Sequence, residues 1–157
     1  MKVKEIMTTS PACCLPSDSS ARAARIMKDM DTGVVPVIDD ETTRKVIGVV
    51  TDRDLCLEVI AEAKDPETVQ VRDCMGRTVV SCTGDDDVEK ALDLMRDNQV
   101  RRIPVVDRKG TIQGIVSLAD VMNRMEVAPD KTKEALKNIS EPSDDASKPR
   151  AQVKKSA

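Results

Sequence analysis

The 157-residue chain contains no phenylalanine, tyrosine, tryptophan or histidine. A hydrophobic core must therefore be built from aliphatic residues and methionine, with cysteine as a small hydrophobic residue. Without histidine the chain has no imidazole for general-base catalysis near neutral pH, no serine–histidine or cysteine–histidine pair, and no zinc site that uses histidine. Without aromatic rings it cannot stack bases, which argues against a site for single-stranded nucleic acid.

A concentrated basic surface and long apolar runs are also missing. The formal net charge is −3 and the lysine and arginine residues are scattered, whereas binding of duplex nucleic acid needs a concentrated basic face. No run approaches the length of a membrane span, and the first residues, MKVKEIMTTSP, lack the apolar stretch of a signal peptide. We therefore expect a cytoplasmic protein that has neither a membrane nor nucleic acid as a partner.

The five cysteines are odd in number and include no CxxC pair, so they indicate neither a disulfide framework nor a thiol redox motif. Because histidine is also absent, we predict no metal site. Cysteines in a reducing compartment are usually packing residues. We expect burial for all of them, Cys13, Cys14, Cys56, Cys74 and Cys82.

The chain repeats itself at an offset of 68 residues. At this offset PVID at 36–39 coincides with PVVD at 104–107, and spaced valine, methionine, cysteine and alanine residues coincide before them. Two residues are missing from the following turn, and at an offset of 66 GVVTDRD at 48–54 coincides with GIVSLAD at 114–120. Agreement at so many spaced positions, with one short gap, indicates an internal duplication.

Each copy predicts the same order of elements: strand, helix, strand, strand and helix. Apolar residues at helical spacing predict the first helix, two β-rich runs around a polar turn predict a hairpin, and Thr51 or Ser117 opens the second helix. One copy would bury too little surface to be stable, whereas two packed together would suffice. The segments predicted before the second helix are 12–15, 17–30, 34–39 and 45–50 in the first copy, and 79–82, 85–100, 102–107 and 111–116 in the second.

These patterns divide the chain into four parts. We expect residues 1–60 to form the first copy, 61–70 a linker and 71–126 the second copy. In 127–157 the segment TKEALKNI predicts a short helix, and the rest is polar, mixed in charge and almost free of large apolar residues. Such a composition is typical of a disordered tail.

The repeated motif, TDRD at 51–54 and SLAD at 117–120, has a purely structural interpretation. In a helix capping box the hydroxyl accepts a hydrogen bond from the backbone amide of the third helical residue and the acid reaches back, each half contributing on the order of 1 kcal/mol. The usual acid is glutamate or glutamine. Aspartate is one methylene shorter than glutamate, and we expect it to reach back less well.

The choice of aspartate in both copies, and the glycine before each motif, favour a ligand site instead. Gly48 and Gly114 stand three residues before the hydroxyl and would let another group approach the strand end closely. Free amides at a helix start, a hydroxyl and a short carboxylate suit a phosphorylated sugar. The amides and hydroxyl can face the phosphate while the carboxylate binds two ribose hydroxyls.

The doubled unit, hhPhhD followed by GhhTxxD or GhhSxxD, resembles the tandem CBS domain, or Bateman module, over residues 3–125. The resemblance implies an α+β fold of two β-α-β-β-α repeats packed through their sheets as a pseudo-twofold pair. It implies a regulatory module that binds AMP, ADP, ATP or S-adenosylmethionine in clefts between the repeats, with no catalysis and no catalytic cofactor. It also favours a homodimer, with a separate effector protein to read the ligand state.

The resemblance implies roles for matching residues. Ribose would be bound by Asp54 and Asp120, and phosphate would be contacted by Thr51 and Ser117. Arg53, Arg101 and Arg102 would add forked donors for phosphate, although such residues can equally be part of the solvated surface. The residues expected around adenine are Ser10, Pro11, Ala12, Val34 and Val35 in the first copy, and Thr78, Val79, Val80, Arg102 and Ile103 in the second.

Two other functions compete with a ligand sensor. The chain could be a structural, RNA-binding or protein-binding CBS pair with degenerate nucleotide pockets, and RNA binding would then depend steeply on salt. An enzyme is disfavoured, because the two motif aspartates belong to separate pockets and no nucleophile–base pair is visible.

Overall fold

The chain folds into two units, and each unit takes segments from both copies of the repeat. The first-copy unit contains Pro11–Val79 and Gly110–Ile112, and the second-copy unit contains Met1–Ser10, Val80–Lys109 and the described residues from Gln113 onward. The structure is a computed structural model that describes residues 1–124 and 129–140. The predicted disordered tail beyond residue 140 lies outside the described residues.

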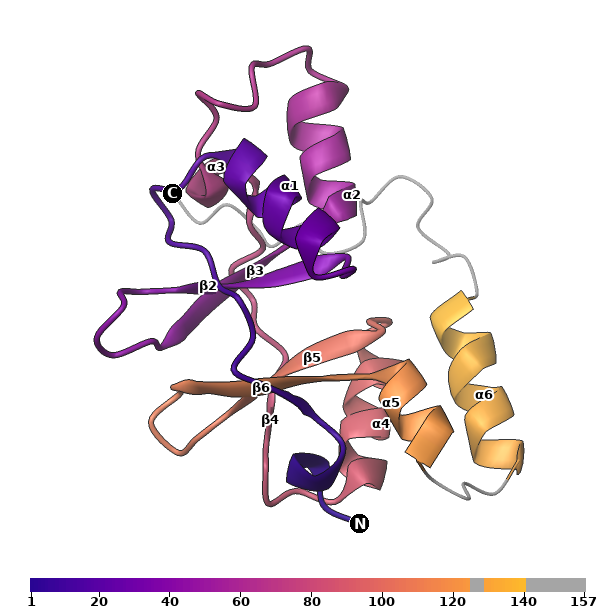
Figure 1. Ribbon diagram of the computed structural model, residues 1–157. Coiled ribbons are helices and arrows are strands. Elements are labelled where there is room, and N and C mark those ends of the chain that lie inside the picture. The colour runs from indigo at the N-terminus through magenta and orange to yellow at the C-terminus, as the bar shows by residue number, and fades with distance from the viewer. Residues whose placement is uncertain (125–128, 141–157) are drawn as a thin grey trace. The chain divides into compact units, whose positions relative to one another are not determined.

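In the first-copy unit a hairpin carries two helices on one side (Figure 1). The hairpin pairs β2 with β3 in antiparallel register, with Val34 opposite Thr51. Single bridges extend it on both edges, from Cys14 to Val37 and from Gly76 to Val49. The elements are α1 (Ser20–Asp29), β2 (Val34–Ile38), β3 (Val46–Thr51), α2 (Asp52–Leu55), the π-helical turn η2 (Cys56–Ile60) and α3 (Val71–Cys74).

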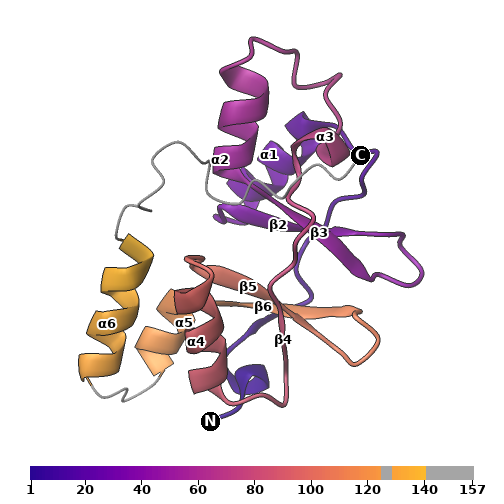
Figure 2. The same cartoon turned by 180° about the vertical axis from the view of Figure 1, so that it is seen from behind.

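The second-copy unit has the same arrangement, but its edge segments are long enough to count as strands. Its sheet has the order β1-β6-β5-β4. Strand β1 is antiparallel to β6 and β4 is parallel to β5. Helices α4 and α5 lie side by side on this sheet (Figure 2). The elements are the 3-10 turn η1 (Val3–Glu5), β1 (Thr8–Thr9), β4 (Cys82–Thr83), α4 (Val88–Asp97), β5 (Arg102–Val106), β6 (Ile112–Ser117), α5 (Leu118–Arg124) and α6 (Pro129–Ser140).

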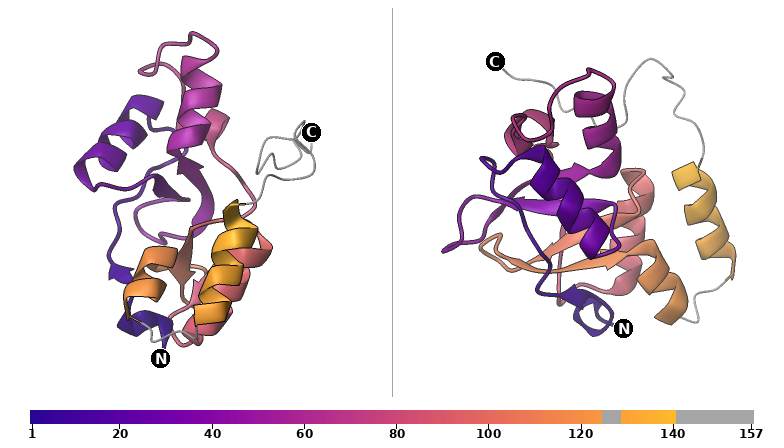
Figure 3. Two further views of the ribbon diagram at one scale, coloured as in Figure 1. Left: turned by 90° about the vertical axis from the view of Figure 1, so that its right-hand side faces the viewer. Right: turned by 45° about the horizontal axis from the view of Figure 1, so that its top comes forward.

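The second-copy unit has an additional helix, α6, which has no counterpart in the first-copy unit. It lies along α4 (Figure 3). Ile139 is 2% exposed and belongs to the hydrophobic core of this unit, and the Gln99 side-chain amide donates to the Asn138 carbonyl at 3.3 Å. The segment TKEALKNI, expected to be helical, lies within α6.

The predicted helices and hairpins are present, with the hairpin strands within one residue of the predicted bounds. Helix α1 begins after Ser19, whose side chain accepts a hydrogen bond from the Arg22 amide, as expected for a capping residue. In α4 the buried face is the one that helical spacing predicts. Its members are Val88, Ala91, Leu92 and Met95.

The strands predicted at 12–15 and 79–82 are largely wrong. Only Cys14 of the first segment pairs with β2, and β4 begins at Cys82, the last residue of the second segment. In both copies the pairing stays short, and an aspartate accepts a hydrogen bond from a backbone amide at its end. Asp18 accepts from the Leu15 amide and Asp86 from the Thr83 amide, both at 2.8 Å. These bonds form local turns, which compete with a strand for the same donors.

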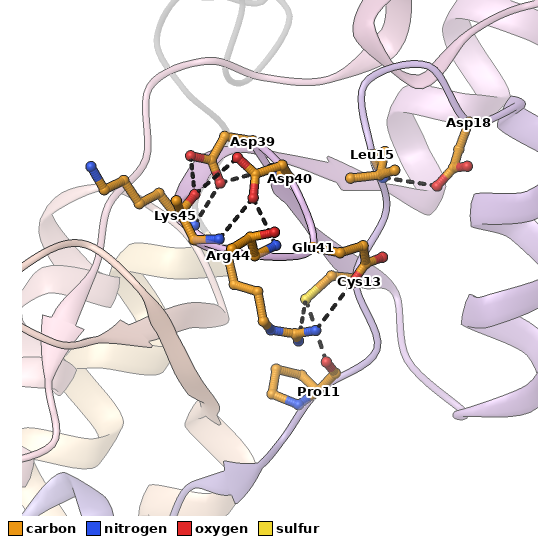
Figure 4. A network of polar contacts seen from close by, with 11 residues as sticks. Pro11, Cys13, Leu15, Asp18, Asp39, Asp40, Glu41, Arg44 and Lys45 are labelled. Atoms are coloured by element: carbon orange, nitrogen blue, oxygen red, sulfur yellow. Dashed lines mark hydrogen bonds and ion pairs between the residues drawn. The ribbon is translucent and has the colours of Figure 1, made fainter.

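The polar turn between β2 and β3 is held by its own carboxylates (Figure 4). One Asp40 oxygen accepts from the amides of Thr42 and Thr43, both at 2.7 Å, and Asp39 accepts from the Lys45 amide at 2.8 Å. These are the bonds of an Asx turn. They satisfy the turn internally and give no indication of a ligand.

The cysteines only partly follow the prediction. Cys14, Cys74 and Cys82 are buried, and burial raises the pKa of Cys14 to about 12 and those of the other two to about 11. Cys13 is half-buried near the Arg44 guanidinium (Figure 4). Cys56 is exposed on η2, so the expected burial is wrong there. Three of the five are thus inert packing residues, as a high thiol pKa disfavours the reactive thiolate.

The first segment of each copy is inserted into the unit of the other copy. The Val3 amide donates to the Asp86 carbonyl at 3.0 Å, and its counterpart Val71 donates to the Asp18 carbonyl at 2.8 Å. The edge bridges Thr8–Ile115 and Gly76–Val49 follow the same exchange. Neither copy therefore forms a complete unit from its own residues.

The exchanged segments explain two of the glycines. A Cβ at Gly48 would lie 2.7 Å from the Gly76 carbonyl oxygen, and a Cβ at Gly114 would lie 2.7 Å from the Thr8 carbonyl oxygen. We expect Gly48→Ala and Gly114→Ala each to lower the free energy of unfolding by about 1–3 kcal/mol, because a backbone atom must move to relieve the clash. The measurement is urea denaturation followed by circular dichroism.

Gly76→Ala is the matched control for both glycine variants, since the nearest atom to its added Cβ, the Val49 carbonyl oxygen, is 3.8 Å away. Its stability should stay close to that of the parent protein. Equal losses in all three variants would contradict the assignment of the clash to Gly48 and Gly114.

Candidate functional site

Two equivalent strand–helix junctions carry the repeated motif. At the first junction β3 ends at Thr51 and α2 begins, and the Asp52 amide donates to the Gly33 carbonyl at 3.1 Å. At the second junction β6 ends at Ser117 and α5 begins, and the Leu118 amide donates to the Arg101 carbonyl at 2.8 Å. Each junction thus ties the start of a helix to the residue that precedes the neighbouring strand.

Both motifs form complete capping boxes. The Asp54 amide donates to Thr51 Oγ1 at 3.1 Å, and the Thr51 amide donates to Asp54 Oδ2 at 2.8 Å. The equivalent distances for Ser117 and Asp120 are 3.1 and 2.8 Å, and Ser117 Oγ also donates to Asp120 Oδ2 at 2.6 Å. The expectation that aspartate reaches back less well is therefore wrong, and helix capping is a real role of the motif.

Capping uses only one oxygen of each motif carboxylate. Both aspartates bond through Oδ2, and among residues 1–124 and 129–140 no hydrogen bond reaches Oδ1 of Asp54 or Asp120. Both side chains are half-buried. Since a carboxylate oxygen can accept more than one hydrogen bond, each junction offers acceptor capacity to hydroxyl groups of a ligand without losing its cap.

The Asp54 carboxyl lies in an environment that disfavours its charge. Burial raises its pKa, the hydrogen bonds from Thr51 oppose this rise, and the negative charges of Glu58 and Asp52 add to it. A group that donates to Asp54 would therefore compensate an ionised oxygen that is short of solvent.

The glycines before the motifs do not require a ligand. The group that approaches Gly48 and Gly114 closely is the backbone of the exchanged segment, through the carbonyl oxygens of Gly76 and Thr8. The sequence correctly indicated a close approach at these positions. It could not indicate that the approaching group is another part of the same chain.

The predicted first-copy site residues lie on both sides of the boundary between the two units, which falls at the peptide bond between Ser10 and Pro11. Pro11, Ala12, Val34 and Val35 share the first-copy unit with Thr51, Arg53 and Asp54, whereas Ser10 belongs to the second-copy unit and donates to the Gln113 carbonyl at 3.3 Å. Val34 lies directly opposite Thr51 in the hairpin and is half-buried.

The predicted second-copy residues divide in the same way. Thr78 and Val79 fall in the first-copy unit. The members that share the second-copy unit are Val80, Arg101, Arg102, Ile103, Ser117 and Asp120.

Three of the residues predicted to surround adenine are enclosed by protein. Val35 is 0% and Ile103 1% exposed, and Pro11 is also buried. As inward-facing strand residues, Val35 and Ile103 are parts of the two hydrophobic cores. Their side chains cannot contact a ligand in this structure, which corrects the prediction to backbone contacts at most.

The three arginines assigned to phosphate are exposed. In the described part of the chain no ion pair involves Arg53, Arg101 or Arg102. Sequence reasoning missed Glu58, whose charge acts on Asp54. The offset of 66 residues that pairs the two motifs also pairs Glu58 with Arg124, and this comparison would have found it.

In 1–124 and 129–140 no three histidine, cysteine, aspartate or glutamate residues are placed to hold a metal ion. In the same residues no helix has the length and apolar character needed to cross a membrane.

The sequence model of the CBS domain matches residues 3–61 and 71–127. The chain belongs to the CBS domain family. One relative is the uncharacterized protein YlbB of Bacillus subtilis, which is 39% identical over 140 residues. The match covers 89% of this chain and 92% of YlbB, so the likeness extends over nearly the whole of both proteins.

Solved CBS structures share the fold. The CBS domain protein TA0289 of Thermoplasma acidophilum superposes with a TM-score of 0.75 at 24% identity, covering 88% of this chain and 75% of that one. The CBS domain pair of protein MJ0100, in complex with 5′-methylthioadenosine and S-adenosylmethionine, gives 0.70 at 24% identity, covering 78% and 94%. The predicted α+β fold with two CBS repeats is thereby confirmed.

The environment of Asp54 predicts how its replacement depends on pH. Because its pKa is raised in the folded state, the folded protein holds this proton more tightly than the unfolded chain. The contribution of Asp54 to the free energy of unfolding is therefore fully present below the unfolded pKa of about 3.9, and it is lost as pH rises through the folded pKa. We expect Asp54→Asn to gain stability relative to the parent between about pH 4 and pH 7, measured by urea denaturation.

Asp86→Asn is the control of opposite sign. Hydrogen bonds from Lys90 and from the Thr83 amide lower the pKa of Asp86, so its contribution is present above the unfolded pKa and is lost as pH falls. Asp86→Asn should therefore lose stability relative to the parent as pH rises to about 5, past the unfolded pKa of about 3.9, and the difference should then stay constant up to pH 7. A parallel pH dependence in the two variants would contradict the assigned environment of Asp54.

Proposed function

We propose that the protein is a sensor that binds adenosine-containing ligands at its two junctions and catalyses no reaction. The observation that carries this proposal is the free acceptor capacity on both motif aspartates, in a cap that is complete without it. The two neighbouring hydroxyl groups of a ribose can both donate hydrogen bonds to the oxygens of one carboxylate. A helix cap alone would not need the second oxygen.

The surroundings of each junction suit the rest of such a ligand. Val34, half-buried and opposite Thr51, offers an aliphatic surface to a base. The exposed Arg53, Arg101 and Arg102 offer forked donors to phosphate. Adenine can be held between aliphatic side chains and backbone groups, so the lack of aromatic residues does not exclude it.

The fold supports the proposal that the ligand contains adenosine. The MJ0100 pair has this fold and is in complex with two adenosyl compounds. At 24% identity this likeness concerns the fold, and which adenosine-containing ligand the present chain prefers has to come from its own residues. AMP, ADP, ATP and S-adenosylmethionine are the candidates.

A sensor must convert binding into a state that something else recognises. This requires a ligand with different affinities for two conformational states. We propose that the protein acts as a homodimer and that a separate effector protein reads its state, in the cytoplasm and without a catalytic cofactor.

A structural or interaction module without a ligand is the second candidate. Two observations favour it: the capping boxes are complete in themselves, and the glycines are explained by the exchanged segments. In this case both motifs would serve only to start α2 and α5.

The test uses the transparency of a chain without aromatic residues. At 260 nm the protein absorbs almost nothing whereas adenine absorbs strongly, so equilibrium dialysis against AMP, ADP, ATP and S-adenosylmethionine reports bound ligand directly. We expect saturable uptake of up to two ligands per chain. Asp54→Ala and Asp120→Ala should each remove one site, because each deletes one carboxylate that binds ribose.

Asp29→Ala is the matched control, since Asp29 is exposed at the end of α1. It should leave uptake unchanged. No uptake of any of the four compounds at about millimolar concentration would leave the cap as the sole role of the motif and would favour the second candidate.

A further inference from the structure

The two junctions match in backbone structure but differ in charge. At the first junction the charged residues are three acids and one base, and at the second they are one acid and three bases. Matched in order, the first set is Gly33, Val34, Asp52, Arg53, Asp54 and Glu58, and the second is Arg101, Arg102, Leu118, Ala119, Asp120 and Arg124.

The match rests on hydrogen bonds as well as on the alignment. The first residue of α2 donates to the Gly33 carbonyl, and the first residue of α5 donates to the Arg101 carbonyl. Arg101 therefore occupies at the second junction the place that Gly33, without a side chain, occupies at the first. Arg102, at the start of β5, likewise replaces Val34 at the start of β2.

The acids of the first junction lie close enough to act on one another. The charges of Glu58 and Asp52 both raise the pKa of Asp54, in addition to the effect of burial. Asp52 is held at the helix start, where its Oδ1 accepts from the Arg53 amide at 2.8 Å. An anionic group placed beside these three carboxylates would be repelled, with Arg53 as the single compensating charge of the set.

The second junction has the opposite character. Arg101 and Arg102 are exposed and take part in no ion pair within the described residues, so their donors are available. Arg124 follows Asp120 by four residues in α5, and this spacing places the two on the same face of a helix. Guanidinium groups in this number favour a phosphate.

We propose that the two sites select ligands by charge: the second junction binds a phosphorylated adenine nucleotide, and the first binds an adenosyl compound that carries no phosphate. This inference rests on the proposed function. S-adenosylmethionine, with its sulfonium and ammonium groups, and the uncharged 5′-methylthioadenosine are the kinds of compound that fit the first junction. The protein then responds to two different molecules rather than to two copies of one.

The experiment isolates each site in the full-length chain and compares two probes. Asp120→Ala leaves the first site and Asp54→Ala leaves the second. For each variant, dialysis gives the dissociation constants of ADP and of 5′-methylthioadenosine, which share adenosine but differ in charge. We expect the ratio of the two constants to differ between the sites by at least about tenfold, and the difference to shrink as salt screens the charges.

Transplanting residues between the copies tests the assignment directly. In the Asp54→Ala background, Arg101→Gly with Arg102→Val gives the second junction the residues of the first. It should weaken ADP binding by about tenfold, through the loss of two guanidiniums, and leave 5′-methylthioadenosine binding unchanged. Arg108→Gly with Lys109→Val removes the same charge from the turn at the opposite end of the β5–β6 hairpin, and should change neither constant.

The outcomes separate this inference from the function on which it rests. Binding of 5′-methylthioadenosine at both sites with equal probe ratios would retain the sensor and overturn the selection by charge. A loss of ADP binding that is the same in the junction variant and in the turn variant would also overturn it, since net charge alone would then explain the effect. Failure of both probes to bind either site would overturn the proposed function and this inference together.

Discussion

The carbonyl oxygens of Gly76 and Thr8 lie 2.7 Å from the places that a side chain would take at Gly48 and Gly114. These contacts allow the first segment of each copy to lie against the last strand of the other copy's hairpin, and the edge bridges of both units follow from them. Strands β3 and β6 are thereby held between two neighbours. Both junctions lie at the ends of these strands, so the positions of Thr51 and Ser117 depend on them.

At the junctions one short motif caps the start of a helix and uses only part of its acceptor capacity. The hydroxyl and one carboxylate oxygen satisfy backbone amides that a helix start would otherwise leave open, and the other oxygen is left over. A glutamate would cap as well, but its longer side chain would place that second oxygen elsewhere.

Regular periodicity is what made most of the fold predictable. The buried face of α4, the two hairpins and the starts of both second helices follow from spacing and capping within about fifteen residues of sequence. The segment at 12–15 was not predictable in this way, because its apolar composition favours a strand while Asp18 takes the Leu15 amide for a turn. The local composition favours a strand, but the Leu15 amide donates to Asp18 and forms a turn instead of pairing in the sheet.

The candidate site was predictable only in part. Asp54 and Asp120 were identified from the motif, and in the structure both are half-buried. Val35 and Ile103 were assigned to the ligand, but they belong to the cores, since β2 and β5 each bury at least three consecutive residues instead of alternating. The exchange of first segments joins residues far apart in the chain, and no local pattern contains that information.

The exchange also sets an order for folding during synthesis. During synthesis residues 1–10 are made more than one hundred residues before their partners in β6. Until then β1 and the apolar residues Val3 and Ile6, both core residues of the finished second-copy unit, have no place to bind. Contacts of such long range close slowly, so Val3 and Ile6 stay exposed on the nascent chain until the second copy has been made.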